Sequence, residues 1–365
     1  MYFSELNEQI PGIHRAAAEE AARRWDAIAK PLGSLGLLET SIIRVAAVTG
    51  SANVRLDKRA VLVLCADNGV VAEGVTQTDS SVTMLVAKNL TRRQTSVCLM
   101  AKQAQADVIP VDIGMNTRPD FPGLTDCRVA DGTRNLYREP AMTREQAIRA
   151  IEHGINLARD CAKNGYNILA TGEMGIGNTT TSSAVAAALL SAPVRGVTGR
   201  GSGLTDTALA RKIAVIETAI SRLKPDASPL EVLAEVGGFD IAGMAGIFIG
   251  GALCGIPVLI DGFISAVSAL LAARLCPNAV HAMLASHVSG EPAGGRVLSE
   301  LGLEPMITAH MRLGEGTGAV AALPLLDLAL AVYSGSSSFA EIGMDAYTEQ
   351  SESPTETQAE PREER

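Results

Sequence analysis

The stretch YNILATGEMGIGN (166–178) decides the fold of this chain, because it has the form of a buried β-strand that runs into a glycine-rich turn. The runs AVLVLCADNG (60–69) and ADVIPVDIG (106–114) have the same form, and each closes on an aspartate followed by a glycine. Stretches with helical spacing separate the three runs. Strands that alternate with helices indicate an α/β protein with a Rossmann-like parallel sheet flanked by helices, whose functional loops lie at the carboxyl edge.

The same patterns predict the remaining elements. We expect further strands over 257–262 and 281–290. Helices are expected over 14–29, 35–49, 80–104, 143–164, 179–190, 205–223, 229–236, 263–275 and 317–332. Residues 242–260 carry no charge, but their glycines and Pro257 favour a buried helix, a turn and a short strand over a helix that spans a membrane.

The charge balance and the cysteine pattern exclude some classes of function. The 365 residues include 31 lysines and arginines and 40 aspartates and glutamates, so the net charge of −9 leaves no basic excess for nucleic acid or an anionic membrane. The six cysteines form no CxxC pair and the five histidines no HExxH motif, so we expect no metal site and no dithiol redox centre. The amino-terminal MYFSELNEQIPG lacks the features of a signal peptide, which favours a cytoplasmic location. We expect the polar residues 346–365 to form a disordered acidic tail.

The densest cluster of candidate functional residues is TGEMGIGNTTTSS (171–183), where a predicted strand meets an alanine-rich helix. Glycines let a ligand approach the backbone, and free N–H groups at a helix start favour an anion. The glycine order GxxGxG and the lack of an acid about 20 residues later argue against a dinucleotide site, and no lysine follows as in a P-loop. A phosphate monoester therefore fits better than a nucleoside triphosphate, and a helix-capping turn without a ligand is the alternative.

Four further residues are candidates. TGRGSG (198–203) precedes another helix, and there Arg200 and Lys212 are either anion ligands or solvated charges. Glu315, in RLGEGTGA (312–319), is either a first-turn acid favoured by the helix dipole or a poorly hydrated carboxylate, whose raised pKa makes a better base. His287 is the histidine that lies beside other polar candidates, namely Ser286, Ser289 and Glu291.

Seven motifs in this chain resemble the nicotinate-nucleotide:dimethylbenzimidazole phosphoribosyltransferase family, over about residues 30–330. In chain order they are KPLGSLGLLE (30–39), ADNGVVAEGV (66–75), GEMGIGNTTTSSAV (172–185), TGRGSGL (198–204), GGFDIAGMAG (237–246), DGFISAVSAL (261–270) and RLGEGTGA (312–319).

The resemblance implies transfer of phosphoribose from nicotinate mononucleotide to an aromatic base, with inversion at the anomeric carbon. The product is the α-ribotide of the cobamide (vitamin B12) lower ligand. The resemblance also implies a large α/β domain over 60–319 and a small helical domain formed from both chain ends, 1–59 and 320–345. It implies a dimer whose active site includes residues from both subunits, and no cofactor.

The resemblance assigns the site residues as well. It makes Glu315 the catalytic base. It places the 5′-phosphate at Gly175, Ile176, Gly177, Asn178, Thr179 and Thr180. It places ribose and nicotinate near Glu173, Lys212, Gly201 and Ser202. It places the acceptor base near Thr78, Val86, Met84 and Leu313.

The sequence departs from the family pattern around the acceptor. Asn68 replaces the usual histidine of an ADHG motif, and Val86 stands where a glutamine helps to hold benzimidazole. A more apolar pocket suits a phenol, and a few relatives activate phenol or p-cresol, some as heterodimers of two similar chains. We therefore expect an acceptor range that includes phenols, with strict use of benzimidazoles as the alternative, and a homodimer or a heterodimer with a paralogous chain.

Two other classes of protein stay open on the sequence. The fold alone is compatible with a nicotinamide-dependent dehydrogenase, although the acid that would bind the ribose is missing. A heterodimer could also hold this chain as a non-catalytic subunit, although Glu315 and the GEMGIGNTT loop are intact.

Overall fold

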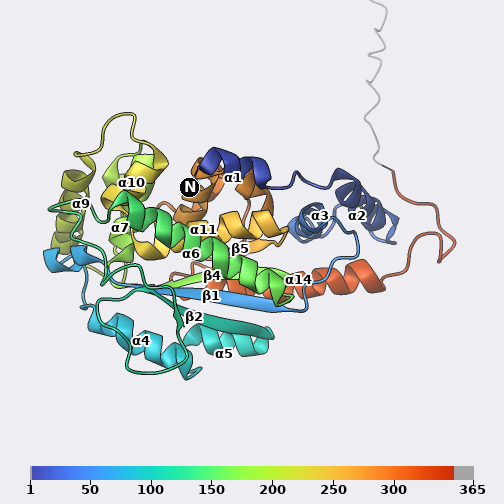
Figure 1. Cartoon of the computed structure of the whole chain (residues 1–365). Coiled ribbons are helices and arrows are strands. Elements are labelled where there is room, and N and C mark those ends of the chain that lie inside the picture. Colours follow the sequence, from blue (N-terminus) through green and yellow to red (C-terminus); the bar gives the residue numbers. More distant parts are fainter. Residues whose placement is uncertain (1, 349–365) are drawn as a thin grey trace, which may run out of the picture.

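The computed structural model describes residues 2–348, and its centre is a six-stranded parallel sheet (Figure 1). The strands are β1 (Arg59–Ala66), β2 (Ala106–Gly114), β3 (Thr125–Asp126), β4 (Ile168–Met174), β5 (Val258–Ile260) and β6 (Met283–Ala285). Their order in the sheet is β3-β2-β1-β4-β5-β6. The order reverses between β1 and β4, and α/β sheets bind ligands at the carboxyl edge beside such a point. The predicted fold class is confirmed.

Fourteen helices appear in the described residues. They are α1 (Phe3–Gln9), α2 (Arg15–Ala27), α3 (Leu37–Thr49), α4 (Ser81–Thr91), α5 (Ser96–Gln103), α6 (Arg144–Lys163), α7 (Asn178–Leu189), α8 (Val194–Val197), α9 (Asp206–Ile220), α10 (Pro229–Val236), α11 (Phe239–Cys254), α12 (Phe263–Leu275), α13 (Gly294–Glu300) and α14 (Thr317–Gly335). Short 3₁₀ helices cover Gly69–Glu73 and Pro277–Ala282.

Helices cover both faces of the sheet, because its strands are apolar on both sides. β1 is buried along its whole length, and its side chains alternate: Leu62 and Leu64 belong to one core cluster, Val61 and Val63 to the other. α6 and α11 lie on the first face, and α4 and α5 lie on the second (Figure 1).

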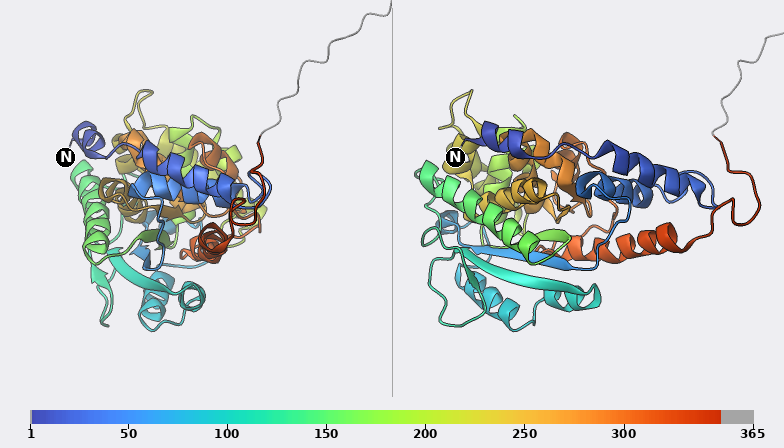
Figure 2. Two further views of the ribbon diagram at one scale, coloured as in Figure 1. Left: turned by 90° about the vertical axis from the view of Figure 1, so that its right-hand side faces the viewer. Right: turned by 45° about the vertical axis from the view of Figure 1, so that its right-hand side comes forward.

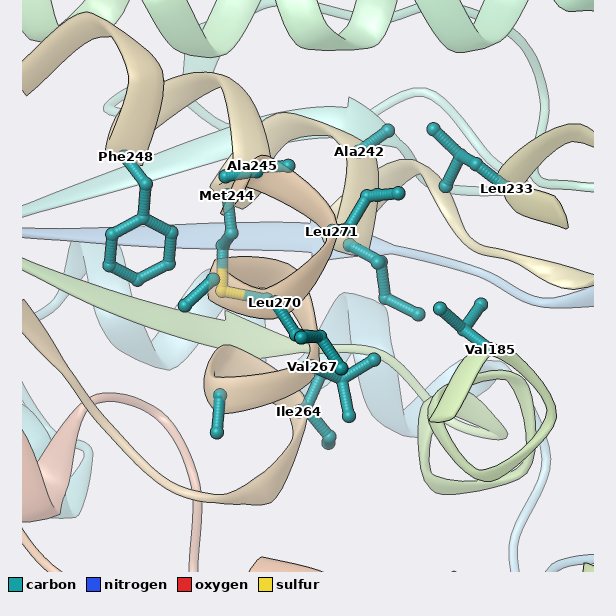
Figure 3. Packing of buried hydrophobic residues seen from close by; sticks show 14 of the residues in the cluster. Val185, Leu233, Ala242, Met244, Ala245, Phe248, Ile264, Val267, Leu270 and Leu271 are labelled. Atoms are coloured by element: carbon teal, nitrogen blue, oxygen red, sulfur yellow. The ribbon is translucent and has the colours of Figure 1, made fainter. Parts of the chain in front are cut away.

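The larger core cluster is centred on α11, which is buried almost along its whole length. Figure 3 shows Met244 and Phe248 of α11 packed beside Val267 and Leu270 of α12. α11 ends at Gly255, and β5 follows directly, so residues 242–260 form the predicted helix, turn and strand.

The second core joins the two ends of the chain. α2, α3 and α14 lie at one end of the molecule (Figure 2), where the Trp25 and Tyr333 rings have centroids 5.0 Å apart. Tyr333 Oη also donates to the Ala52 carbonyl at 2.9 Å. The packing agrees in kind with a helical unit built from both chain ends, whereas the domain boundaries stay a prediction. The acidic tail expected over 346–365 lies outside the described residues from position 349 onward.

One helix of the described residues, α14, is long and apolar enough to span a membrane by length and composition. However, 44% of its most apolar stretch is buried inside the protein, with Leu323 and Leu326 in the second core. A core helix passes the same test of length and composition, and this packing is that of a core helix.

One prediction about the elements was wrong. The helix predicted over 80–104 is two helices, α4 and α5, because Arg93 adopts a left-handed conformation (φ 61°) and Thr95 then begins a new helix as its N-cap. The sequence interpretation also missed α1, α8, α13 and β3, which are all seven residues or shorter.

Candidate active site

A cleft of about 410 Å³ opens at the carboxyl edge of the sheet, within the size range of small-molecule sites. Its walls come from the loops after β4, β5 and β6 and from the segments 75–78, 200–204 and 312–315. The cleft brings together predicted residues from three of the motifs, together with Thr78. Those that line it are Thr78, Glu173, Gly175, Ile176, Gly177, Asn178, Thr179, Gly201, Ser202, Leu313 and Glu315.

The glycine loop after β4 forms one wall and presents the start of α7. Gly175 is required there, because a Cβ at this position would lie 2.5 Å from the Ala66 carbonyl oxygen of β1. Gly177 precedes α7 with φ 92°, and the backbone N–H groups of Gly177 and Thr179 have no acceptor among residues 2–348. Free N–H groups at the positive end of a helix dipole bind anions, so this wall can hold a phosphate.

Lys212 supports the same wall from behind. The side chain is fully buried on α9, and its Nζ donates to Thr179 Oγ1 at 2.9 Å and to the Gly199 carbonyl at 3.2 Å. Burial lowers the pKa of Lys212 to about 8, and the charge of Glu291 opposes that shift. No salt bridge to this ammonium exists among the described residues, so an anion at Thr179 would supply the missing negative charge.

A buried acid network lies under the glycine loop. The Asn178 amide nitrogen donates to Glu173 Oε2 and, at 3.1 Å, to Asp240 Oδ2. Burial, followed by the charge of Asp240, raises the pKa of Glu173 to about 8, while burial raises the pKa of Asp240 to about 6. With a pKa of about 8, the Glu173 carboxyl group holds a proton at neutral pH, so its O–H is able to donate a hydrogen bond to a ligand in the cleft.

Two predicted phosphate ligands have side chains placed differently from expectation. The Asn178 amide nitrogen is engaged by the acid network, and Thr180 is fully buried. Successive residues on a helix point about 100° apart, so the turn that places Thr179 in the cleft directs Thr180 into the protein. Only their backbone positions, at the start of α7, remain near a bound anion.

Glu315 lies on a tightly folded loop between β6 and α14. Gly314, Glu315 and Gly316 have φ angles of 90°, 60° and 93°, and the left-handed conformation costs a non-glycine residue such as Glu315 about 1–2 kcal/mol. The loop lies directly on β4, where a Cβ at Gly172 would be 2.4 Å from the Glu315 carbonyl oxygen. Strained residues that are held this firmly cluster at functional sites.

The Glu315 carboxylate is half-buried in the cleft at the start of α5. Its Oε2 accepts a long hydrogen bond, 3.4 Å, from the Val97 N–H. Burial raises the pKa of Glu315, and the Val97 N–H and the Thr95 hydroxyl oppose this rise. The break between α4 and α5, which the sequence interpretation missed, is what places a helix start beside this acid.

Asp261 is a residue that the sequence interpretation did not assign to the site. It follows β5 and lines the cleft, and its carboxylate accepts backbone hydrogen bonds from the start of α14. Its signal in the sequence is the one carried by Asp67 and Asp112, an acid that ends an apolar strand. Asp240, likewise unassigned, is the buried partner of Asn178.

Of the four residues predicted for the acceptor pocket, two line the cleft and two do not. Thr78 and Leu313 line the cleft, and Leu313 is 57% exposed. Met84 and Val86 lie on α4 against the second core and do not line the cleft of this chain, so their role stays a prediction.

Two further candidates, His287 and Arg200, also lie at the cleft. His287 is buried at the cleft with its Nδ1 3.1 Å from Ser286 Oγ. Arg200 lines the cleft and forms a salt bridge with Asp206. Among residues 2–348, no group of three or more histidines, cysteines or acids is arranged to hold a metal ion.

Comparison with known proteins adds independent findings. Residues 10–344 match the model of a family described as phosphoribosyltransferase. The chain is 44% identical over 351 residues, 96% of its length and all of the relative's, to the nicotinate-nucleotide–dimethylbenzimidazole phosphoribosyltransferase of Acetivibrio thermocellus. It is 47% identical over 330 residues to the protein of the same name from Chloroflexus aggregans, covering 90% of this chain and 94% of that one.

A solved structure is also similar. The crystal structure of CobT from Thermus thermophilus superposes with a TM-score of 0.87 at 40% sequence identity, over 90% of this chain and 99% of that chain.

Proposed function

Because this chain belongs to the nicotinate-nucleotide–dimethylbenzimidazole phosphoribosyltransferase family, we propose that it transfers the phosphoribosyl group of nicotinate mononucleotide to an aromatic base. The products are nicotinate and the α-ribotide from which the nucleotide loop of a cobamide is assembled. The reaction is a pentosyl transfer, so the protein is a glycosyltransferase.

One observation carries the proposal: the Glu315 carboxylate and the start of α7 line the same cleft. The α7 start and the cation of Lys212 suit the 5′-phosphate of the donor. A sugar anchored there by its phosphate has its anomeric carbon within the cleft that Glu315 also enters. The protonated Glu173 suits the ribose hydroxyls, as a hydrogen-bond donor.

The proposed chemistry needs one base and no acid. A lone pair on the acceptor nitrogen forms the new bond to C1′ as the bond from C1′ to the nicotinate nitrogen breaks. Both electrons of the broken bond return to the pyridine ring, which leaves neutral at that nitrogen. The acceptor's other N–H proton moves to Glu315, and burial favours this transfer because it raises the pKa of the carboxyl group.

We propose further that the acceptors include phenols. The cleft that Glu315 lines is also lined by the apolar side chains of Val75, Val82 and Leu313, and by the uncharged polar side chains of residues 76–78. A phenol offers one polar atom, whose proton Glu315 would remove, and needs no second polar partner. Strict use of benzimidazoles is the alternative.

The experiment is a competition among acceptors. The purified protein is incubated with nicotinate mononucleotide and an equimolar mixture of 5,6-dimethylbenzimidazole, phenol and p-cresol, and the products are identified by mass spectrometry. The proposal predicts ribotides of dimethylbenzimidazole and of at least one phenol. Products from the benzimidazole alone would remove the phenol proposal, and no product with any acceptor, with or without a paralogous chain, would contradict the transferase.

The oligomeric state of the protein is measured in the same experiment. We predict a homodimer, or a heterodimer with a paralogous chain. A cytoplasmic location also stays a prediction. Size-exclusion chromatography of the assayed protein gives its oligomeric state. Activity that appears only when a paralogous chain is added would show that this chain is a partner-dependent subunit.

A further inference from the structure

We propose that Asp261 is the positioning residue for Glu315, holding the Glu315 loop in its left-handed conformation through three backbone hydrogen bonds. The inference rests on the proposed function, in which Glu315 is the base.

Asp261 contacts the backbone directly after Glu315 and in the first turn of α14. Oδ2 accepts from the N–H of Gly316, at 3.2 Å, immediately after Glu315. Oδ1 accepts from the N–H groups of Gly318 and Ala319, at 2.7 and 3.0 Å, in the first turn of α14. One buried carboxylate therefore fixes the loop and the helix that follows it as one unit.

Asp261 is itself held in place by the sheet. Its backbone N–H donates to Ser265 Oγ at 3.0 Å, and that hydroxyl lies 2.6 Å from Thr171 Oγ1 on β4. Thr171 is next to Gly172, on which the Glu315 carbonyl rests. The chain of contacts thus starts and ends on β4, and it ties the base to the strand that also carries the phosphate-binding turn.

An ordinary helix cap does not explain this arrangement. A capping side chain satisfies one or two N–H groups of the first turn. Asp261 comes from a different strand and also binds Gly316, which precedes α14 and directly follows the strained Glu315. The hydrogen bond from the Gly316 N–H therefore controls the position of Glu315, the proposed base.

Asp261 also acts on Glu315 through its charge. The titratable and charged groups around Glu315 are Glu173 at the end of β4, Asp261 after β5, His287 after β6, packed on Gly318, and Arg312 in the same loop. α5 contributes the Val97 N–H and the Thr95 hydroxyl. After burial, the negative charge of Asp261 adds to the rise in the pKa of Glu315. Neutralising Asp261 therefore moves the acidic limb of the pH–rate profile to lower pH.

The test is a double-mutant cycle with Asp261→Asn and Glu315→Gln. Asparagine keeps the shape, but it has one acceptor oxygen and places an NH₂ donor against backbone donors. We expect Asp261→Asn to lower kcat by about tenfold or more, as for a displaced catalytic group, and to change the KM for nicotinate mononucleotide much less. In the Glu315→Gln background, the same substitution should change kcat by less than about twofold, because the two residues act as one unit.

Ser228→Ala is the matched control. Ser228 caps α10 in a capping box away from the cleft, so its loss should lower the melting temperature and leave kcat unchanged. An equal loss of kcat from Asp261→Asn in both backgrounds would overturn the proposal.

The activities of the wild type and of these variants also distinguish a failure of this proposal from a failure of the proposed function. Wild-type protein without transferase activity, alone and with a paralogous chain, would contradict the function itself. An active wild type with an unaffected Asp261→Asn variant would contradict only the role of Asp261.

Discussion

Glu173 makes the folded state sensitive to pH, because its buried carboxyl group lies beside a second acid. Its pKa rises from 4.5 to about 8, through burial first and the charge of Asp240 next. An acid whose pKa is raised on folding stabilises the folded state below its unfolded pKa, and that contribution is lost as the pH rises through the folded pKa. For Glu173 the contribution is complete below about pH 4.5 and gone above about pH 8.

The size of the effect follows from this interval. Each pH unit is worth about 1.4 kcal/mol, so the range from 4.5 to about 8 corresponds to about 5 kcal/mol. Protein relaxation and water penetration lower the free-energy cost of a buried ion. We therefore expect ionisation of Glu173 to lower the free energy of unfolding by about 2–4 kcal/mol. Glu173→Gln keeps the shape and an oxygen for the Asn178 amide, but it does not ionise. Relative to wild type, its free energy of unfolding should therefore rise by that amount between pH 5 and pH 8.

The assay is guanidinium unfolding followed by circular dichroism at pH 5, 6, 7 and 8. Glu152→Gln, an exposed position on α6, is the control and should show no such trend. A difference between Glu173→Gln and wild type that is the same at pH 5 and pH 8 would refute the reasoning, because Glu173 would then be ionised in the folded protein or accessible to water.

Three further predictions concern turnover and donor binding. Glu315→Gln should lower kcat by about 100-fold or more with little change in KM, measured as the initial rate of nicotinate release. Gly175→Ala places a methyl group 2.5 Å from the Ala66 carbonyl oxygen, so calorimetry should show nicotinate mononucleotide bound about tenfold or more weakly, with an unchanged affinity as the contrary result. Lys212→Met should raise the KM for the donor, and wild-type affinity should fall above about pH 8 as the ammonium loses its proton; an affinity independent of pH up to about 9 would speak against that role.

Local patterns in the sequence were enough to predict the strands of the sheet other than β3, and most helices. The strand over 106–114 and the helices over 229–236 and 263–275 lie at the predicted residues. The strand and the second helix are continuous apolar runs, and the first helix begins with a capping box at Ser228. The acids and glycines at the strand ends also predicted which edge of the sheet carries the cleft.

What the sequence could not predict depends on contacts between distant segments. The left-handed Arg93 divides one apolar stretch into α4 and α5, and only the tertiary structure shows that this break meets Glu315. Asp261 is an ordinary strand-end acid until the start of α14 donates backbone hydrogen bonds to it. Asn178 is a plausible phosphate ligand until the buried Asp240, on another helix, engages its amide.

The most direct test of the central claim compares acceptors that differ in the acidity of the N–H proton that Glu315 would remove. The measurement is the ratio of wild-type kcat to Glu315→Gln kcat with benzimidazole and with 5-nitrobenzimidazole, whose N–H is more acidic. If Glu315 takes that proton during the transfer, the ratio is large for benzimidazole and clearly smaller for the nitro compound. A ratio that is the same for both acceptors would mean that Glu315 does something other than accept the proton.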